Sequence, residues 1–342
     1  MPSVSTFPDT TAGGAATPAR LAGILATGSC VPDGVISNAD LEQLVETSDA
    51  WILERTGISQ RHKVGAGVTT SVLAAAAGRM AMERAGVETV DAIIVATCTP
   101  DTFVPSTACL VQRRLNLPGI PAFDVNAACS GFVYGLALAN SLIGQGAINS
   151  LLLIGAESLT QLVDYTDRST CVLFGDGAGA AVLGPVASGG MRAVRWAADG
   201  SGSDLIYHGP KAGEDGAMSG PDGLRMLGKG TFRLAVERMI ETVGALCADA
   251  GWSPDDIDVV IPHQANLRII EAVSKRIGVP LSRFMVNIDR MGNTSAASIP
   301  IAMDEAASTG RLRDSDRVIF VGFGAGITWG GAAMEWTRPA SR

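Results

Sequence analysis

The stretch DVNAACSGFVYGLALA, residues 124–139, joins a short apolar segment to a buried helix through a cysteine. The segment PAFDV has the length and apolar character of a buried strand, and Asn126 ends it. Cys129 follows among Ala, Ser and Gly, ahead of an apolar run. A helix start offers free N–H groups and partial positive charge, which lower the pKa of a thiol. The stretch predicts an α/β fold with Cys129 as a nucleophile at a strand–helix junction.

Strands and helices alternate along the rest of the chain. Ser37, followed three residues later by Asp40, indicates a helix start. The patterns predict strands near 92–96, 121–125, 150–155 and 179–184, and helices over 70–85, 106–115 and 129–145. Such alternation is typical of a layered α/β protein, in which active sites lie at the carboxyl ends of strands.

The second half of the sequence repeats the first. Ala-Gly before an acidic turn and a buried strand occurs at 85–86 and again at 250–251. FDVN from 123 matches FMVN from 284, and FGDGAGAAVLG from 174 matches GFGAGITWGG from 322. Three matches in the same order indicate a duplication. We therefore expect an unstructured tail at 1–19 and then two similar halves around one core, 20–185 and 186–342.

The composition argues against several classes of protein. Hydrophobic residues make up 47% and charged residues 18%, as in a folded protein with a large core. The net charge of −8 argues against nonspecific nucleic-acid binding. No apolar run reaches the roughly 18 residues of a membrane span. Six cysteines without a CxxC pair and three histidines predict no metal site and reduced thiols in a cytoplasmic protein.

Two polar residues that follow the duplicated pattern are candidates to join Cys129. His263 follows the apolar segment DVVIP, and the polar run after it lets the imidazole face a cleft. Asn293, in MGNTSAAS, lies in the turn that the duplication places opposite Cys129. An amide there can donate a hydrogen bond to developing negative charge. The residues alone leave a structural histidine and a simple helix cap open as alternatives.

Glycine-rich runs at 175–180 and 322–326 match a dinucleotide-binding loop only in part. That fingerprint requires a helix after its glycines, whereas both runs continue as strands, AAVLG and ITWGG. We therefore expect no nucleotide cofactor. The sequence also lacks a GxSxG elbow, which argues against an ordinary serine hydrolase.

Taken together, these motifs resemble the β-ketoacyl-acyl-carrier-protein (ACP) synthase III family of the thiolase superfamily. The resemblance rests on ACSGF, HQAN, GNTSAAS, GFGAGITWG, ETSDAWILERTGI and FGDGAGA, and it spans residues 20–337. It implies a homodimer of α/β chains. Each chain would have thiolase-like duplicated βαβαβαββ halves that form a five-layer αβαβα architecture.

The resemblance also implies a ping-pong condensation that needs no cofactor. An acyl group moves from acyl-CoA to Cys129, and malonyl-ACP then loses CO2 and attacks that thioester. The reaction starts a fatty-acid or polyketide chain. His263 and Asn293 would hold the malonyl thioester oxygen. The backbone N–H groups of Cys129 and Ala325 would form the oxyanion hole.

Other positions match residues with which the family binds its substrates. Those that match contacts to CoA and its pantetheine arm are Trp51, Arg55, Arg168, Met226, Gly228, Phe232 and Asn266. Because ACP is acidic, the basic residues Arg268, Arg233 and Lys275 are expected to meet it. Ordinary helix packing of Trp51 and a solvated basic face are the alternatives.

Val104 matches the place where a dimer partner closes the acyl pocket. Its small side chain leaves volume there, so we expect acyl chains longer than acetyl to be accepted.

Relatives with this fold leave four alternatives open. A synthase III-like acyltransferase, or a starter-unit synthase of a secondary-metabolite pathway, would share the nucleophile. A hydroxymethylglutaryl-CoA-synthase-like enzyme would need a general acid, and the sequence shows no Glu placed for that role. A non-catalytic scaffold subunit would be expected to lose Cys129.

Overall fold

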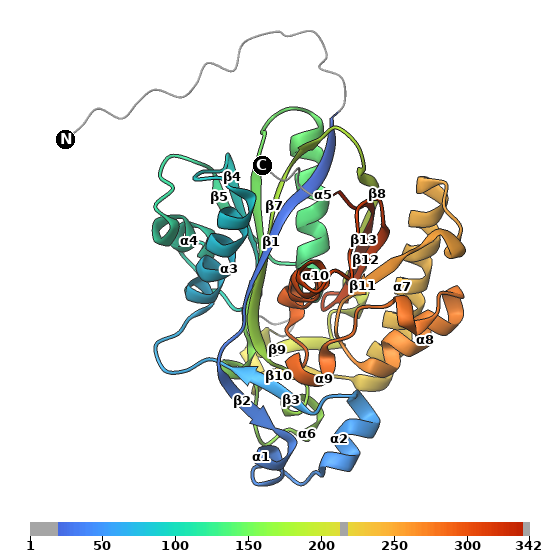
Figure 1. Cartoon of the computed structure of the whole chain (residues 1–342). Coiled ribbons are helices and arrows are strands. Elements are labelled where there is room, and N and C mark those ends of the chain that lie inside the picture. Colours follow the sequence, from blue (N-terminus) through green and yellow to red (C-terminus); the bar gives the residue numbers. More distant parts are fainter. Residues whose placement is uncertain (1–19, 213–217, 338–342) are drawn as a thin grey trace, which may run out of the picture.

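The computed structural model describes residues 20–212 and 218–337, so the tail expected at 1–19 lies outside the described residues. Two large sheets run through the molecule, with helices between and outside them (Figure 1). Within the described ranges, no helix has the length and apolar character that a membrane span requires.

The first sheet comes from the N-terminal half. Its strands, in spatial order, are β1 (Leu21–Cys30), β7 (Asp176–Val186), β6 (Leu151–Ser158), β4 (Ala92–Ala96) and β5 (Ala122–Val125). β4 runs parallel to both β5 and β6, whereas β7 lies antiparallel between β6 and β1. β4 and β6 are buried along their whole length, as central strands of a covered sheet are.

The second sheet comes from the C-terminal half and has the order β11 (Val259–Pro262), β12 (Arg317–Gly324), β13 (Thr328–Glu335) and β8 (Gly190–Ala198). The FDVN and FMVN match corresponds to equivalent pairing. Phe123 pairs with Ile94 in β4, and Phe284 forms a parallel bridge to Val260 in β11. The fifth strand of this half is reduced to that single bridge.

Helices complete five layers, and the predicted αβαβα architecture is confirmed. They are α3 (Thr70–Ala85) and α4 (Thr107–Leu115) outside the first sheet, α5 (Gly131–Gly144) and α10 (Ser298–Ser308) between the sheets, and α7 (Gly228–Ala250) and α8 (Leu267–Ile277) outside the second. Figure 1 shows the central pair enclosed by both sheets.

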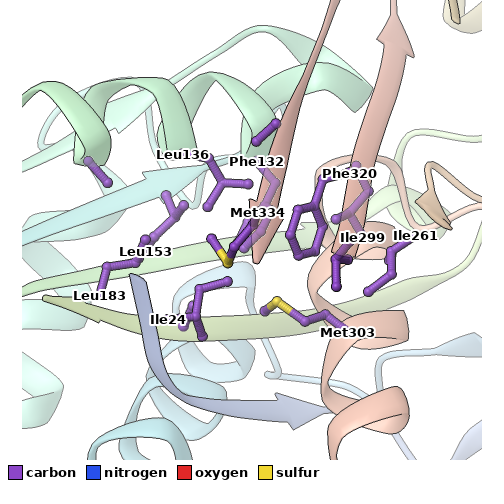
Figure 2. Packing of buried hydrophobic residues seen from close by; sticks show 14 of the residues in the cluster. Ile24, Phe132, Leu136, Leu153, Leu183, Ile261, Ile299, Met303, Phe320 and Met334 are labelled. Carbon is purple, nitrogen blue, oxygen red and sulfur yellow. The ribbon is translucent and has the colours of Figure 1, made fainter. Parts of the chain in front are cut away.

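The central layer explains the apolar sequence of α5. Phe132 and Leu136 of α5 pack in one cluster with Ile299 and Met303 of α10 (Figure 2). A helix enclosed on every side must be apolar on every side. Gly135 lets α5 approach β6, because a side chain there would collide with Leu153.

Smaller elements gather at one end of the layers. They are β2 (Gly34–Ser37), α1 (Asn38–Glu42), α2 (Asp49–Thr56), β3 (Gln60–Lys63), α6 (Arg168–Cys171), β9 (Ile206–Ala212), β10 (Met218–Met226) and α9 (Ile288–Met291). The predicted helix start at Ser37 is confirmed as a capping box with Asp40.

Two expected boundaries were wrong. The helix predicted from 129 begins at Gly131, after a 3₁₀ turn over Ala128–Ser130. β6 continues past residue 155 to Ser158. Its last residues are polar, so hydrophobicity gave no sign that they continue a buried strand.

Candidate active site

Cys129, His263 and Asn293 line one cavity of about 930 Å³. Cys129 follows β5, His263 follows β11, and Asn293 precedes α10. The carboxyl ends of one strand from each half therefore deliver Cys129 and His263, and the turn between α9 and α10 brings Asn293 to the same cavity. In the described part of the chain, no group of three His, Cys, Asp or Glu side chains is arranged to hold a metal ion.

The backbone around Cys129 is held by the strand that faces it. Ala128 has φ +47°, in the left-handed region that is unfavourable for alanine. The Thr328 hydroxyl donates to the carbonyl oxygen of Ala127 at 2.8 Å. The start of β13 therefore holds the turn in a conformation that it would not adopt alone.

The Cys129 thiol is less acidic than the sequence led us to expect. Burial raises its pKa to about 11, and the charge of Glu157 acts in the same direction, while a hydrogen bond from the Ser295 hydroxyl opposes both. The prediction of a lowered pKa is wrong for the resting protein, because loss of water around the sulfur outweighs the helix start. A base must therefore accept the thiol proton when the Cys129 sulfur acts as a nucleophile.

His263 is buried at the end of β11, where its backbone N–H donates to Val321 at 2.8 Å. Nδ1 lies 2.7 Å from the Ser298 hydroxyl, which also accepts the N–H of Gln264 at 3.3 Å. The hydroxyl proton can then go to Nδ1, which places the ring proton on Nε2. Burial lowers the pKa of His263 to about 3, so the imidazole is neutral.

Asn293 is held from two directions. Its backbone N–H donates to Leu173 at 2.8 Å, and its Oδ1 accepts the N–H of Ser295 at 2.9 Å. The side chain thus caps the following turn, as the simpler alternative required. With Oδ1 so engaged, Nδ2 is the donor that Asn293 can offer to the cavity.

Gly324, at the end of β12, lies against the backbone of Cys129. A Cβ at Gly324 would stand 2.8 Å from the Cys129 nitrogen and 3.0 Å from the Ser130 nitrogen. Only a glycine allows this approach. Ala325 comes next and lines the cavity, so the two N–H groups expected to form an oxyanion hole belong to adjoining segments.

Gly324→Ala is expected to displace the Cys129 backbone and to lower condensing activity on the order of 100-fold, because small misplacements at a reacting centre have large effects. Steady-state activity and a melting curve would check this. Gly244→Ala in α7 is the matched control, because nothing lies within 4 Å of a Cβ there. Unchanged activity in Gly324→Ala would mean that the two backbones can separate without harm.

Comparison with known proteins identifies the family. A model of the 3-oxoacyl-(acyl-carrier-protein) synthase III family matches residues 123–200, and a model of its C-terminal part matches 247–336. A β-ketoacyl-ACP synthase III of Xanthomonas euvesicatoria is 46% identical over 321 residues, which cover 93% of this chain and 98% of that protein. The chain belongs to the β-ketoacyl-ACP synthase III family. The synthase III of Coxiella burnetii is also 46% identical, over 93% of this chain and 99% of its own.

Solved structures agree with this membership. Synthase III of Aquifex aeolicus superposes with a TM-score of 0.87 at 42% identity, covering 92% of this chain and 100% of that one. The Thermus thermophilus enzyme gives 0.88 at 45% identity, with 92% and 99% covered. A priming β-ketosynthase of a polyketide pathway gives 0.89 at 32% identity, with 96% and 99% covered. This chain is therefore an acyltransferase of the β-ketoacyl-ACP synthase III type.

Most positions expected to bind CoA lie on the cavity of this synthase III. The lining includes Trp51, Arg55, Met226, Gly228, Phe232 and Asn266. Arg168 is not among the described lining residues. Its guanidinium lies 4.8 Å from the centre of the Trp51 ring. Arg168, which is distant in sequence, therefore stacks on Trp51.

The basic residues expected to meet ACP differ in position. Arg268 lines the synthase III cavity, and its guanidinium lies 5.7 Å from the ring centre of Phe232. Arg233 and Lys275 are exposed but do not belong to the lining. Lys229, which sequence reasoning did not single out, does line the cavity. A surface lysine carries no distinguishing signal in a sequence.

Sequence reasoning also missed a group of residues beside the nucleophile. Cys98 and Ser295 line the cavity, and the Cys98 thiol donates to Glu157 at 3.3 Å. The expectation that no Glu is placed as the general acid of a hydroxymethylglutaryl-CoA-synthase-like enzyme stays a prediction, because Glu157 lies behind Cys98 and is not among the described residues that line the cavity. Glu157 follows the apolar run LLLIGA, and an acidic residue that ends such a run was the available signal.

Proposed function

We propose that this synthase III condenses an acyl-CoA starter with malonyl-ACP through an acyl thioester on Cys129, and that it thereby initiates fatty-acid synthesis. The supporting observation is the convergence of one thiol with two neutral donors, His263 Nε2 and Asn293 Nδ2, in one cavity. A thiol suits acyl transfer, and fixed neutral donors suit an oxygen that gains charge during decarboxylation.

In the first half-reaction, the Cys129 sulfur attacks the carbonyl carbon of the starter. The carbonyl oxygen becomes negative and accepts hydrogen bonds from the N–H groups of Cys129 and Ala325. The carbon–sulfur bond to CoA then breaks. CoA leaves with the proton that Cys129 gave up, and the acyl group remains on the enzyme.

In the second half-reaction, malonyl-ACP enters the same cavity. The bond to its carboxylate carbon breaks, CO2 leaves, and the electron pair moves toward the thioester oxygen. His263 and Asn293 donate to that oxygen and stabilise the enolate. The enolate carbon then attacks the acyl-Cys129 carbonyl. A carbon–carbon bond forms, and the Cys129 thiolate departs and takes up a proton from solvent, which restores the thiol.

Two alternatives are less well supported. A plain acyltransferase does not require a donor at Asn293, yet Asn293 is held with Nδ2 available. A starter-unit role in polyketide synthesis rests on the priming ketosynthase at 32% identity, whereas synthase III relatives reach 46% over nearly their whole length.

We also propose the binding surfaces. CoA would lie along Trp51 and Arg55, with Arg168 stacked on Trp51 from outside the cavity. ACP would approach over Arg268, with Arg233 and Lys275 on the exposed surface around it. Opposite charge would speed the encounter with an acidic carrier.

The exposed loop before α4 supports a homodimer. Val104 is 86% exposed and Phe103 is 99% exposed, and neither belongs to the described lining of its own cavity. Neighbouring apolar side chains exposed to this extent are available to contact a partner. We propose that Val104 closes the acyl pocket of a partner subunit.

We also propose that the halves 20–185 and 186–342 act as the two domains and that the protein is cytoplasmic. The six cysteines are all free thiols, which is in keeping with a cytoplasmic location.

Intact-protein mass spectrometry with acetyl-, hexanoyl- and octanoyl-CoA would test the proposal. The expected result is a mass gain on Cys129, stronger with the longer donors, that malonyl-ACP clears with release of a β-ketoacyl product. Clearance without that product would indicate a plain acyltransferase, and no adduct from any donor would overturn the proposal. Much better use of acetyl-CoA would overturn the chain-length expectation alone.

The lowered pKa of His263 predicts how condensation depends on pH. Because burial holds this pKa near 3, the imidazole stays neutral as pH falls through 6.5, its ordinary value. The malonyl-ACP step on acylated enzyme should therefore show no inflection near that value. The unfolded chain does bind a proton there, so His263 makes the fold less stable below it. A pH–rate profile of pre-acylated enzyme checks the prediction, and an inflection at the ordinary histidine value would contradict it.

A further inference from the structure

Glu157 is a fully buried carboxyl group that the proposed reaction does not use. It lies near the end of β6 and has 0% exposure. The Thr99 hydroxyl donates to it at 2.7 Å, the Thr97 hydroxyl at 3.2 Å, and the backbone N–H of Cys98 at 3.2 Å. Burial raises the pKa of this carboxyl group, and the hydrogen bonds oppose that rise and hold the group in one orientation.

A line of polar side chains connects this carboxylate to the nucleophile. The Cys98 thiol donates to Glu157 at 3.3 Å and lies 3.9 Å from the Ser295 hydroxyl. Hydrogen bonding to the Ser295 hydroxyl opposes the rise in the pKa of both the Glu157 carboxyl group and the Cys129 thiol. Ser295, Cys98 and Cys129 line the same cavity, with Glu157 behind them.

The position of Ser295 is fixed by its backbone. Its φ is +48°, in the left-handed region, and its N–H donates to Asn293 Oδ1 at 2.9 Å. The turn that carries it packs directly on β6, because a side chain at Gly155 would collide with the Ala296 carbonyl. A strained residue held this firmly is typical of a functional site.

The Ser295 hydroxyl has a single proton, so it can donate to only one of its two neighbours, Cys129 and Glu157, at a time. A serine hydroxyl has one proton and accepts through its lone pairs. While Cys129 is a thiol, its S–H can donate to Ser295, and Ser295 donates to Glu157. Once Cys129 is a thiolate, Ser295 donates to the sulfur. The hydroxyl can therefore pass a proton between the two groups.

We propose that Glu157 is a positioning residue that takes up the Cys129 proton through Ser295 during acylation. This inference rests on the proposed function. As the sulfur bonds to the acyl carbon, its proton moves to the Ser295 oxygen and the Ser295 proton moves to the carboxylate. When the bond to CoA breaks, the departing thiolate receives a proton back through Ser295. Glu157 is then ionised again, and the proton from Cys129 has been transferred to the CoA thiol.

His263 is less suited to this task. Burial lowers the pKa of the imidazole to about 3, whereas burial raises the pKa of Glu157 above its ordinary value. The carboxylate is thus the stronger base. The titratable groups that face Glu157 are the thiols Cys98 and Cys129, and neither competes for a proton near neutral pH, because the pKa of each is raised.

The test is the acylation rate of Glu157→Gln, followed by rapid quench and intact mass. Near neutral pH, the transfer from octanoyl-CoA to Cys129 should slow about 100-fold, which is within the usual range for loss of a general base. Near pH 10 the rate should approach that of the wild type, because hydroxide then takes up the proton. Once acylated, the variant should condense with malonyl-ACP at the wild-type rate.

Two further variants distinguish proton transfer from a general loss of structure. Ser295→Gly, which accepts the positive φ, should show the same pH-dependent slowing, and the double variant should be no slower than either single one. Asp176→Asn is the matched control, because Asp176 is equally buried and bonds Thr160 and Val64 away from the cavity. It should lose stability without a pH-dependent defect in acylation.

Slowing of Glu157→Gln by the same factor at both pH values would show a structural role and overturn the inference. An equal loss in acylation and condensation would do the same. Absence of an adduct on the wild-type enzyme would instead contradict the proposed function, so the two failures are distinguishable.

Discussion

Cys129→Ser is expected to abolish the acyl-enzyme and to lower condensation on the order of 10³-fold or more, as removal of a covalent nucleophile does. Serine fits the space of cysteine, so the turn held by Thr328 and Gly324 should persist. Its hydroxyl is a much weaker nucleophile than a thiolate. Intact-mass measurement after exposure to octanoyl-CoA, together with a condensation assay, gives the comparison.

Cys30→Ser is the matched control for that experiment. Cys30 is also a partly exposed thiol whose pKa is raised by burial, but it does not line the cavity. It should keep both the adduct and the activity. An acyl adduct of wild-type yield on Cys129→Ser would place the nucleophile elsewhere.

Asn293→Ala is expected to lower the malonyl-ACP step by about 100-fold to 1000-fold, the usual effect of losing one donor to an oxyanion. Acylation of Cys129 should change little, because the starter oxygen is expected to bind backbone N–H groups. The two half-reactions are measured separately, with acylation followed by mass and condensation started from isolated acyl-enzyme.

Asn293→Asp separates the two functions of this side chain. A carboxylate keeps the shape and can still accept the Ser295 N–H, but it has no Nδ2 donor. Condensation should therefore fall at least as far as in Asn293→Ala. Near-normal condensation in Asn293→Asp would mean that Asn293 only caps the turn.

Much of the fold could be predicted from local patterns. The helix over 70–85 and the strand over 92–96 occur where the sequence indicated, because apolar spacing follows directly from whether a segment is buried on one side or on both. The match between residues 123 and 284 identified equivalent strands, one of which is only a bridge. The end of β6 was missed because burial of Glu157 depends on donors from another strand end.

Some residues of the candidate site could be predicted from short motifs, whereas contacts between distant segments could not. Cys129, His263 and Asn293 could be found because each belongs to a short motif after a strand or before a helix, and the duplication relates their turns. The stacking of Arg168 on Trp51 and the contact of Ser295 with Glu157 could not, because each joins segments more than 100 residues apart. No periodicity relates such pairs.

Periodicity and motifs in the chain thus specify the layers, the duplication and the three candidate catalytic residues, because these depend on neighbours within a few positions. Protonation states depend on the folded surroundings. Removal of water by distant segments raises the pKa of Cys129 to about 11 and lowers that of His263 to about 3. Desolvation sums over every atom packed around a group, and most of those atoms come from other parts of the chain. The protonation states of Cys129 and His263 therefore depend on three-dimensional packing, whereas both residues can be identified from their sequence motifs.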